Sequence, residues 1–102
     1  MKIEYSPQAR TDLKEMNQYV AQVLHNPTAA KKLTEGLVRG AHLLAGQPEL
    51  GVEMRDKLNR DVPYRCLIKG NFGIFYAVTG ESIRIVRILD LRTDYLRTLF
   101  AE

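Results

Sequence analysis

The sequence of 102 residues predicts an α+β fold: a short N-terminal strand, a helical hairpin, an antiparallel three-stranded meander joined to that strand, and a short C-terminal helix. Two observations predict it. Apolar residues recur at helical spacing between residues 6 and 46, and three apolar segments between residues 64 and 89 have connections too short for a parallel crossover. Helices and strands thus occupy separate parts of the chain, which is typical of an α+β domain.

The chain opens with the strand-like alternation Ile3-Glu4-Tyr5, which is too short to stand alone and is expected to add an edge to the later sheet. Ser6 and Pro7 then mark a helix start, because serine supplies a capping oxygen and proline fits the first helical position. The apolar stripe of this helix is predicted to consist of Ala9, Leu13, Met16, Val20 and Leu24.

Asn26 and Pro27 repeat this start signal for a second helix. Gly46 is predicted to end it with a left-handed backbone conformation. Because so few residues join the two helices, they are expected to be antiparallel neighbours. The apolar stripe of the second helix is predicted to consist of Ala30, Leu33, Leu37, Ala41 and Leu44.

A turn at Gln47–Gly51 leads into residues 52–63, the least periodic part of the chain. Basic and acidic residues are interleaved there, namely Arg55, Lys57 and Arg60 with Glu53, Asp56 and Asp61. Two interpretations stay open, an ordinary surface loop and a loop that contacts a substrate.

Three strands are predicted next, at residues 64–69, 72–78 and 83–89. Gly70-Asn71 indicates a two-residue hairpin turn, and residues 79–82 allow a slightly longer turn. Residues 92–100 follow as the final helix. Since no repeat or linker interrupts the chain, residues 1–102 are predicted to form a single domain.

Composition narrows the possible functions. A formal net charge of +3 is too small to indicate nucleic-acid binding by itself. Cys66 is the only cysteine, so neither an internal disulfide nor a cysteine zinc site is possible, and a buried thiol is expected. No apolar signal segment opens the chain, and no apolar run approaches the roughly 20 residues of a membrane span. A cytoplasmic protein with no membrane partner is therefore expected.

Familiar catalytic motifs are scarce. The only two histidines, His25 and His42, both fall in the helical hairpin, so a Ser-His-Asp or Cys-His arrangement with residues of the sheet is not expected. The sequence has neither a glycine-rich phosphate loop nor metal-ligand spacing, and no metal or cofactor is expected.

Basic residues lie in or at the ends of the predicted strands: Arg65, Lys69, Arg84, Arg87 and Arg92. Such side chains bind phosphates through charge-assisted hydrogen bonds, and they can stabilise the charge that develops when RNA is cleaved without a metal. The nearby groups able to transfer a proton are Asp90, Asp94 and Tyr95. The residue types alone are also compatible with plain binding, or with a solvated face of the sheet.

Several strings resemble the RelE/ParE superfamily of bacterial type II toxin–antitoxin toxins. In chain order they are Ser6-Pro7-Gln8-Ala9 with Asp12-Leu13, the Pro48–Gly51 turn, Gly70-Asn71-Phe72-Gly73-Ile74-Phe75-Tyr76, and Arg87-Ile88-Leu89-Asp90-Leu91-Arg92-Thr93-Asp94-Tyr95. The resemblance covers essentially the whole chain. It implies the RelE/ParE fold and a cytoplasmic toxin that a cognate antitoxin protein holds inactive.

The superfamily divides by mechanism, and the cluster of Arg and Tyr residues around the final strand favours the RelE-like branch of ribosome-dependent mRNA endonucleases. This interpretation implies a metal-independent endoribonuclease that acts on mRNA at the ribosome. The catalytic residues it implies are Arg65, Arg87, Arg92 and Tyr95. The residues expected to bind RNA or the partner are Arg55, Lys57, Lys69, Arg84 and Asp94.

Two departures from the RelE-like pattern keep alternatives open. Gly73 stands where RelE-like toxins carry a catalytic arginine, and Asp90 stands where many relatives place histidine or tyrosine. The first alternative is a ParE-like inhibitor of DNA gyrase that has no nuclease activity. The second is a degenerate toxin that only binds its antitoxin.

Overall fold

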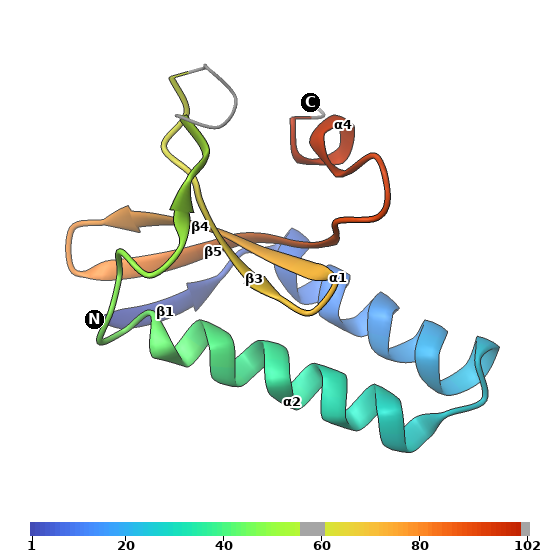
Figure 1. Ribbon diagram of the computed structural model, residues 1–102. Helices are drawn as coiled ribbons and strands as arrows, with labels where there is room; N and C mark the ends of the chain where they lie inside the picture. The colour runs from blue at the N-terminus through green and yellow to red at the C-terminus, as the bar shows by residue number, and fades with distance from the viewer. Residues whose placement is uncertain (56–60, 101–102) are drawn as a thin grey trace.

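The computed structural model describes residues 1–55 and 61–100 and confirms the α+β class. In chain order the elements are β1 (Lys2–Tyr5), α1 (Pro7–Gln18), the π-helical segment η1 (Tyr19–Val23), α2 (Pro27–Leu43), β2 (Val52–Glu53), β3 (Arg65–Lys69), β4 (Phe72–Thr79), β5 (Ser82–Asp90) and α4 (Tyr95–Leu99). The strands form one sheet in the order β1-β5-β4-β3-β2, with β1 parallel to β5 and the other neighbours antiparallel. Figure 1 shows α1 and α2 on one side of the sheet and α4 on the other.

Both predicted helix starts are confirmed. The Ser6 hydroxyl accepts a hydrogen bond from the backbone N–H of Ala9 at 3.0 Å, and the Asn26 side-chain oxygen accepts one from Ala29 at 3.0 Å. The predicted stripe of the first helix is wrong at its end, because α1 gives way to η1 and Leu24 is exposed. A π-helical turn holds an extra residue, which shifts the following side chains around the helix axis.

The end of α2 also differs from the prediction. Positive φ angles occur, among the described residues, at His25, Gly70 and Gly80, so Gly46 does not take a left-handed conformation. A tight turn ends the helix instead, in which the N–H of Gly46 donates to the carbonyl of Leu43 at 3.2 Å. Short turn bonds of this kind pair the last helical carbonyls without a left-handed residue.

The antiparallel meander is confirmed, with one turn shorter than predicted. Gly70 and Asn71 form the two-residue turn between β3 and β4. The turn between β4 and β5 is equally short, because Thr79 pairs with Ser82 across it. The sequence analysis missed β2, whose two residues pair with β3, because a strand this short has no alternation to detect.

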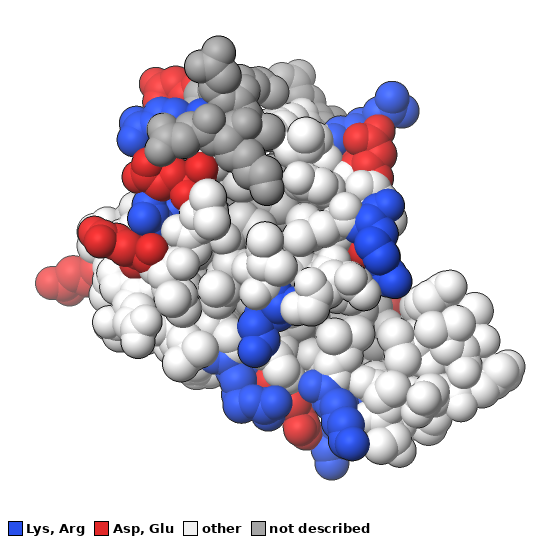
Figure 2. All heavy atoms as spheres, in the orientation of Figure 1, with Lys and Arg blue, Asp and Glu red and all other residues white. Residues whose placement is uncertain are grey.

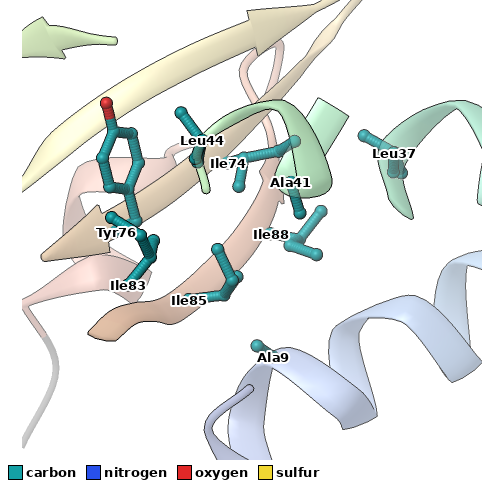
Figure 3. Close-up of a cluster of buried hydrophobic side chains, with 9 residues drawn as sticks. All are labelled: Ala9, Leu37, Ala41, Leu44, Ile74, Tyr76, Ile83, Ile85 and Ile88. Atoms are coloured by element: carbon teal, nitrogen blue, oxygen red, sulfur yellow. The ribbon is translucent and has the colours of Figure 1, made fainter. Parts of the chain in front are cut away.

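Two hydrophobic clusters lie on opposite faces of the sheet. Nine buried residues pack between the helices and the sheet (Figure 3): Ala9, Leu37, Ala41, Leu44, Ile74, Tyr76, Ile83, Ile85 and Ile88. The other face, beside α4, carries the buried residues Met54, Cys66, Phe75, Leu89 and Leu99. Cys66 is thus buried as predicted. No described helix is both long and apolar enough to cross a membrane.

Side chains from the start of the helical hairpin complete one edge of the sheet. β1 is shorter than β5, so part of β5 has no described strand beside it on that side. There the Ser6 hydroxyl donates to the Val86 carbonyl at 2.7 Å, and the Asp12 carboxylate accepts the backbone N–H of Ile88 at 2.9 Å. The Ser-Pro-x-Ala and Asp-Leu strings of the sequence therefore pair backbone groups of β5.

Candidate functional site

The structure distributes the cations of the sheet over two faces and one edge. Arg65 pairs with Tyr76 across the strands, so alternation places both Arg65 and Lys69 on the face that the helices cover. Arg84 lies on the opposite face, because its neighbours on both sides in β5 point to the helices. Arg87 lies at the edge of β5, and Arg92 follows the end of that strand.

Arg87 is held by Asp12 of α1. Its Nε and Nη2 donate to the two carboxylate oxygens, each at 2.8 Å. The exposed fraction is 22% for the Arg87 side chain and 9% for the Asp12 side chain. The hydrogen bond to Asp12 raises the pKa of Arg87, so the guanidinium stays charged. Because both donors on one side of the fork are used, this arginine is poorly placed to bind a phosphate.

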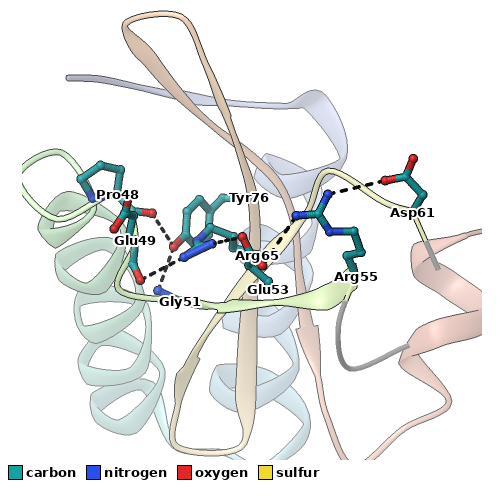
Figure 4. A network of polar contacts seen from close by, with 8 residues as sticks. All are labelled: Pro48, Glu49, Gly51, Glu53, Arg55, Asp61, Arg65 and Tyr76. Atoms are coloured by element: carbon teal, nitrogen blue, oxygen red, sulfur yellow. Dashed lines mark hydrogen bonds and ion pairs between the residues drawn. The ribbon is translucent and has the colours of Figure 1, made fainter. Parts of the chain in front are cut away.

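Arg65 belongs to a network of charged groups beside the Pro48–Gly51 turn (Figure 4). Its Nη1 donates to Glu53 Oε1 at 3.0 Å. Arg55 lies 3.8 Å from Glu53 and 3.8 Å from Asp61, measured between guanidinium nitrogens and carboxylate oxygens. These four side chains and the turn line a hollow of about 570 Å³. Acidic and basic groups both line it, so the hollow does not select an anion.

Arg92 is the most exposed of the predicted catalytic residues, with 66% of its side chain accessible. Its Nη2 and Nε donate to the Asp90 carboxylate at 2.7 Å and 3.0 Å. This pairing lowers the pKa of the Asp90 carboxyl and raises that of Arg92. The Asp90 carboxylate is therefore ionised near neutral pH and holds the Arg92 side chain in place. Both residues line an open groove of about 490 Å³, whose other wall includes Met16 and Leu24 of the hairpin.

Tyr95 packs in the cluster beside α4, where its ring stacks on Phe75 with centroids 5.8 Å apart. Asp94 precedes α4 and pairs with Arg97 at 3.3 Å. Of the other predicted binding residues, Lys69 and Arg84 are exposed, and Lys57 lies outside the described residues. The catalytic and binding roles of all these residues stay predictions.

No group of three or more His, Cys, Asp or Glu side chains within residues 1–55 and 61–100 is arranged to hold a metal ion. Arg65, Arg87 and Arg92 each pair with one carboxylate. The arrangement can therefore bind charged groups or hold them in place.

The sequence analysis gave no structural role to two residues, Tyr76 and Asp12, that hold the turn and the strand edge beside these arginines. Tyr76 is fully buried, and its hydroxyl donates to the Pro48 carbonyl and accepts the N–H of Gly51, each at 2.8 Å. Asp12 holds Arg87 and the edge of β5. Two strings of the family resemblance could have pointed to these roles. The Pro-x-x-Gly string is the turn that Tyr76 binds, and the Asp-Leu string contains Asp12.

Gly73 is closely surrounded on the face beside α4. A Cβ atom at this position would lie 2.9 Å from Cys66 Sγ, 2.9 Å from Leu91 Cδ2 and 3.0 Å from Phe75 Cε2. Core packing thus fills the place where the resemblance to RelE-like toxins calls for an arginine. A side chain here would have to displace the cluster beside α4.

Replacing Gly73 with alanine is expected to lower the free energy of unfolding by about 1 to 3 kcal/mol, because the new methyl group overpacks this cluster. Gly36→Ala is the matched control: its Cβ would meet only Arg39, at 3.9 Å, and alanine favours the helix. Urea unfolding of the two variants measures the difference. Equal stabilities would contradict the packing described for Gly73.

A protein-family model described as "ParE toxin of type II toxin-antitoxin system, parDE" matches residues 3–95 of the chain. The chain belongs to the ParE toxin family. A solved chain described as "Chromosomal ParDE TA system from P. aeruginosa" is similar in structure, with a TM-score of 0.74 and 24% sequence identity over 89% of this chain and 96% of that one. No curated protein matches the sequence. Membership of the ParE family confirms the RelE/ParE resemblance, and neither match names a nuclease.

Proposed function

We propose that the chain is a type II toxin that inhibits DNA gyrase in the cytoplasm and that a cognate antitoxin neutralises. The observation that carries the proposal is the ParE-family match, which extends over residues 3–95. Gyrase is the target that the resemblance gives for ParE-like members, whereas mRNA at the ribosome is the target of RelE-like members.

The surroundings of the predicted nuclease residues support this choice. Arg65, Arg87 and Arg92 each have a carboxylate partner, with donor to oxygen distances from 2.7 to 3.0 Å. A nuclease needs such cations free to stabilise charge on the phosphate. Tyr95 has its ring stacked in the hydrophobic cluster beside α4, and Gly73 has no room for an arginine. An inhibitor that acts by binding needs none of these groups for chemistry.

Ribosome-dependent mRNA cleavage is the second candidate, and one observation favours it. Arg92 is mostly exposed and borders an open groove, so a rotation of its side chain would free it from Asp90. The exposed pair is easily separated, since water and salt screen ion pairs at the surface.

The test is to express the full chain without an antitoxin, then map mRNA 5′ ends and gyrase-linked DNA breaks in the same culture. DNA breaks with intact mRNA are expected, and the doubly substituted Arg92→Ala, Tyr95→Phe chain is expected to retain this effect if it folds. New mRNA ends without DNA breaks, lost in that variant, would overturn the proposal in favour of the nuclease. Purified gyrase with the purified chain then tests whether the effect is direct.

A further inference from the structure

The excess positive charge of the chain lies on the helical hairpin. Both α1 and α2 cover the same side of the sheet, and their exposed residues point away from it (Figure 1). We call this surface the outer hairpin face; it consists of Arg10, Lys14 and Gln18 of α1 and Lys31, Lys32, Glu35, Arg39 and His42 of α2. It holds five of the 15 Lys and Arg residues but one of the 12 Asp and Glu residues. The rest of the chain is therefore nearly neutral, with ten basic and eleven acidic residues.

The acidic side chains of α1 point to the edge of the sheet instead. Asp12 binds Arg87, and Glu15 lines a hollow with these two residues beside β5. On α2, Glu35 lies 4.0 Å from Arg39, and their side chains are 51% and 72% exposed. Water and salt screen an exposed pair at this distance, so it holds neither group tightly. The outer hairpin face thus keeps its positive charge.

Most cations of this face have no carboxylate partner. Within residues 1–55 and 61–100, no carboxylate oxygen lies within 4.0 Å of the charged groups of Arg10, Lys14, Lys31 and Lys32. Six of the eight described cations elsewhere do have one: Lys2, Arg55, Arg65, Arg87, Arg92 and Arg97. Figure 2 shows several basic side chains over α2, along its lower border, and most of the acidic side chains of this view at its upper left.

The two helices present these cations on a fixed support. Asn17 Nδ2 of α1 donates to Thr34 Oγ1 of α2 at 2.9 Å, which ties the helices together. Lys14 lies one turn from Asn17 and Lys31 one turn from Thr34, on opposite sides of this bond because the helices are antiparallel. From Lys31 to the Arg39 backbone α2 rises about 12 Å, a length that spans roughly three phosphates of one DNA strand. The face can therefore contact several phosphates at once.

The chemistry of the face suits a double helix. Unpaired Lys and Arg side chains grouped on one surface are typical of proteins that bind nucleic-acid phosphates. None of the residues of the outer hairpin face is aromatic, so it offers no platform on which unpaired bases could stack. A duplex keeps its bases stacked inside and presents its phosphates outside. It therefore fits this face better than a single strand does.

We propose that the outer hairpin face binds duplex DNA through its phosphates, without selecting a sequence. The choice of DNA over double-stranded RNA rests on the proposed function, because gyrase acts on DNA. Phosphate contacts of this kind bring the toxin to the DNA on which gyrase works and raise its local concentration there.

The test titrates the purified full chain into a labelled DNA duplex of mixed sequence at several salt concentrations, with fluorescence anisotropy as the readout. Two double variants remove charge from the face: Arg10→Ala with Lys14→Ala, and Lys31→Ala with Lys32→Ala. The control is Lys2→Ala with Arg97→Ala, which removes two exposed charges from the other side of the sheet. The hairpin variants are expected to fold, because alanine favours helices at least as well as Lys and Arg. Circular dichroism checks this.

The unsubstituted chain is expected to bind the duplex more weakly as the salt concentration rises. In a plot of log association constant against log salt concentration, the expected slope is about −4, which corresponds to four or five phosphate contacts. Each hairpin variant is expected to bind about tenfold more weakly at low salt and to make the slope shallower by about 2. The control is expected to bind like the unsubstituted chain.

Other outcomes would overturn the inference. An equal loss in the control would show that only the net charge matters. Equally tight binding of a single strand, or tighter binding of double-stranded RNA, would exclude duplex DNA as the preferred ligand. If the chain binds no duplex and both hairpin variants lose inhibition of gyrase, the face contacts the enzyme itself, and the proposed function stands. Duplex binding by a chain that does not inhibit gyrase would support the inference and overturn the proposed function.

Discussion

Replacing Asp12 with alanine is expected to lower the free energy of unfolding by about 3 kcal/mol or more. The substitution leaves the Arg87 guanidinium, only 22% exposed, without its carboxylate, and it leaves the backbone N–H of Ile88 without its acceptor. Removing one partner of a largely enclosed ion pair costs about 3 to 5 kcal/mol, and an unpaired buried donor adds about 1 to 3 kcal/mol. Chemical unfolding followed by circular dichroism measures the change.

Glu15→Ala is the matched control for this prediction. Glu15 lies one turn along α1, is exposed, and acts on Arg87 only through its charge at longer range. Its removal is expected to change stability by less than about 0.5 kcal/mol. A loss from Asp12→Ala no larger than that from Glu15→Ala would show that the Asp12 pair does not support the edge of β5.

Replacing Tyr76 with phenylalanine is expected to lower the free energy of unfolding by about 2 to 4 kcal/mol. The hydroxyl bonds both the Pro48 carbonyl and the Gly51 N–H, and its loss leaves two polar groups of the turn unpaired. The hydroxyl is tightly enclosed on the Gly51 side, where an added Cβ would lie 2.7 Å from it. Thermal and urea unfolding both measure this change.

Tyr19→Phe provides the control for Tyr76→Phe, because it removes the same atom from a tyrosine that is exposed on the hairpin. That change is expected to leave the unfolding midpoint where it is. If the two variants unfold alike, the turn does not depend on the Tyr76 hydroxyl.

The sequence predicted the elements that have explicit local signals. Serine and asparagine before proline located both helix starts, and a Gly-Asn pair located a hairpin turn. The π-helical segment η1 and the strand β2 were missed because neither has a local pattern of its own: η1 reads as a continuation of α1, and β2 has two residues. These elements depend on contacts with distant parts of the chain.

The candidate site was harder to predict for a similar reason. The sequence shows which arginines lie in strands, but it does not show which carboxylates reach them. Asp12 and Arg87 are 75 positions apart, and Glu53 and Arg65 are 12 apart across two strands. Only the folded chain shows that these arginines are already paired with carboxylates. Paired arginines are less available to a phosphate, and this is why we prefer gyrase inhibition to a nuclease as the proposal.

The position of β4 has a consequence for how the domain responds to a partner. Phe75 and Tyr76 are consecutive and fully buried, one in each of the two hydrophobic clusters. Local unfolding of either cluster releases the backbone of β4 at these two residues, so we expect the two faces of the sheet to unfold as one cooperative unit. A protein that binds only one face then slows hydrogen exchange on both, and the toxin gains resistance to proteolysis well beyond the surface that is covered.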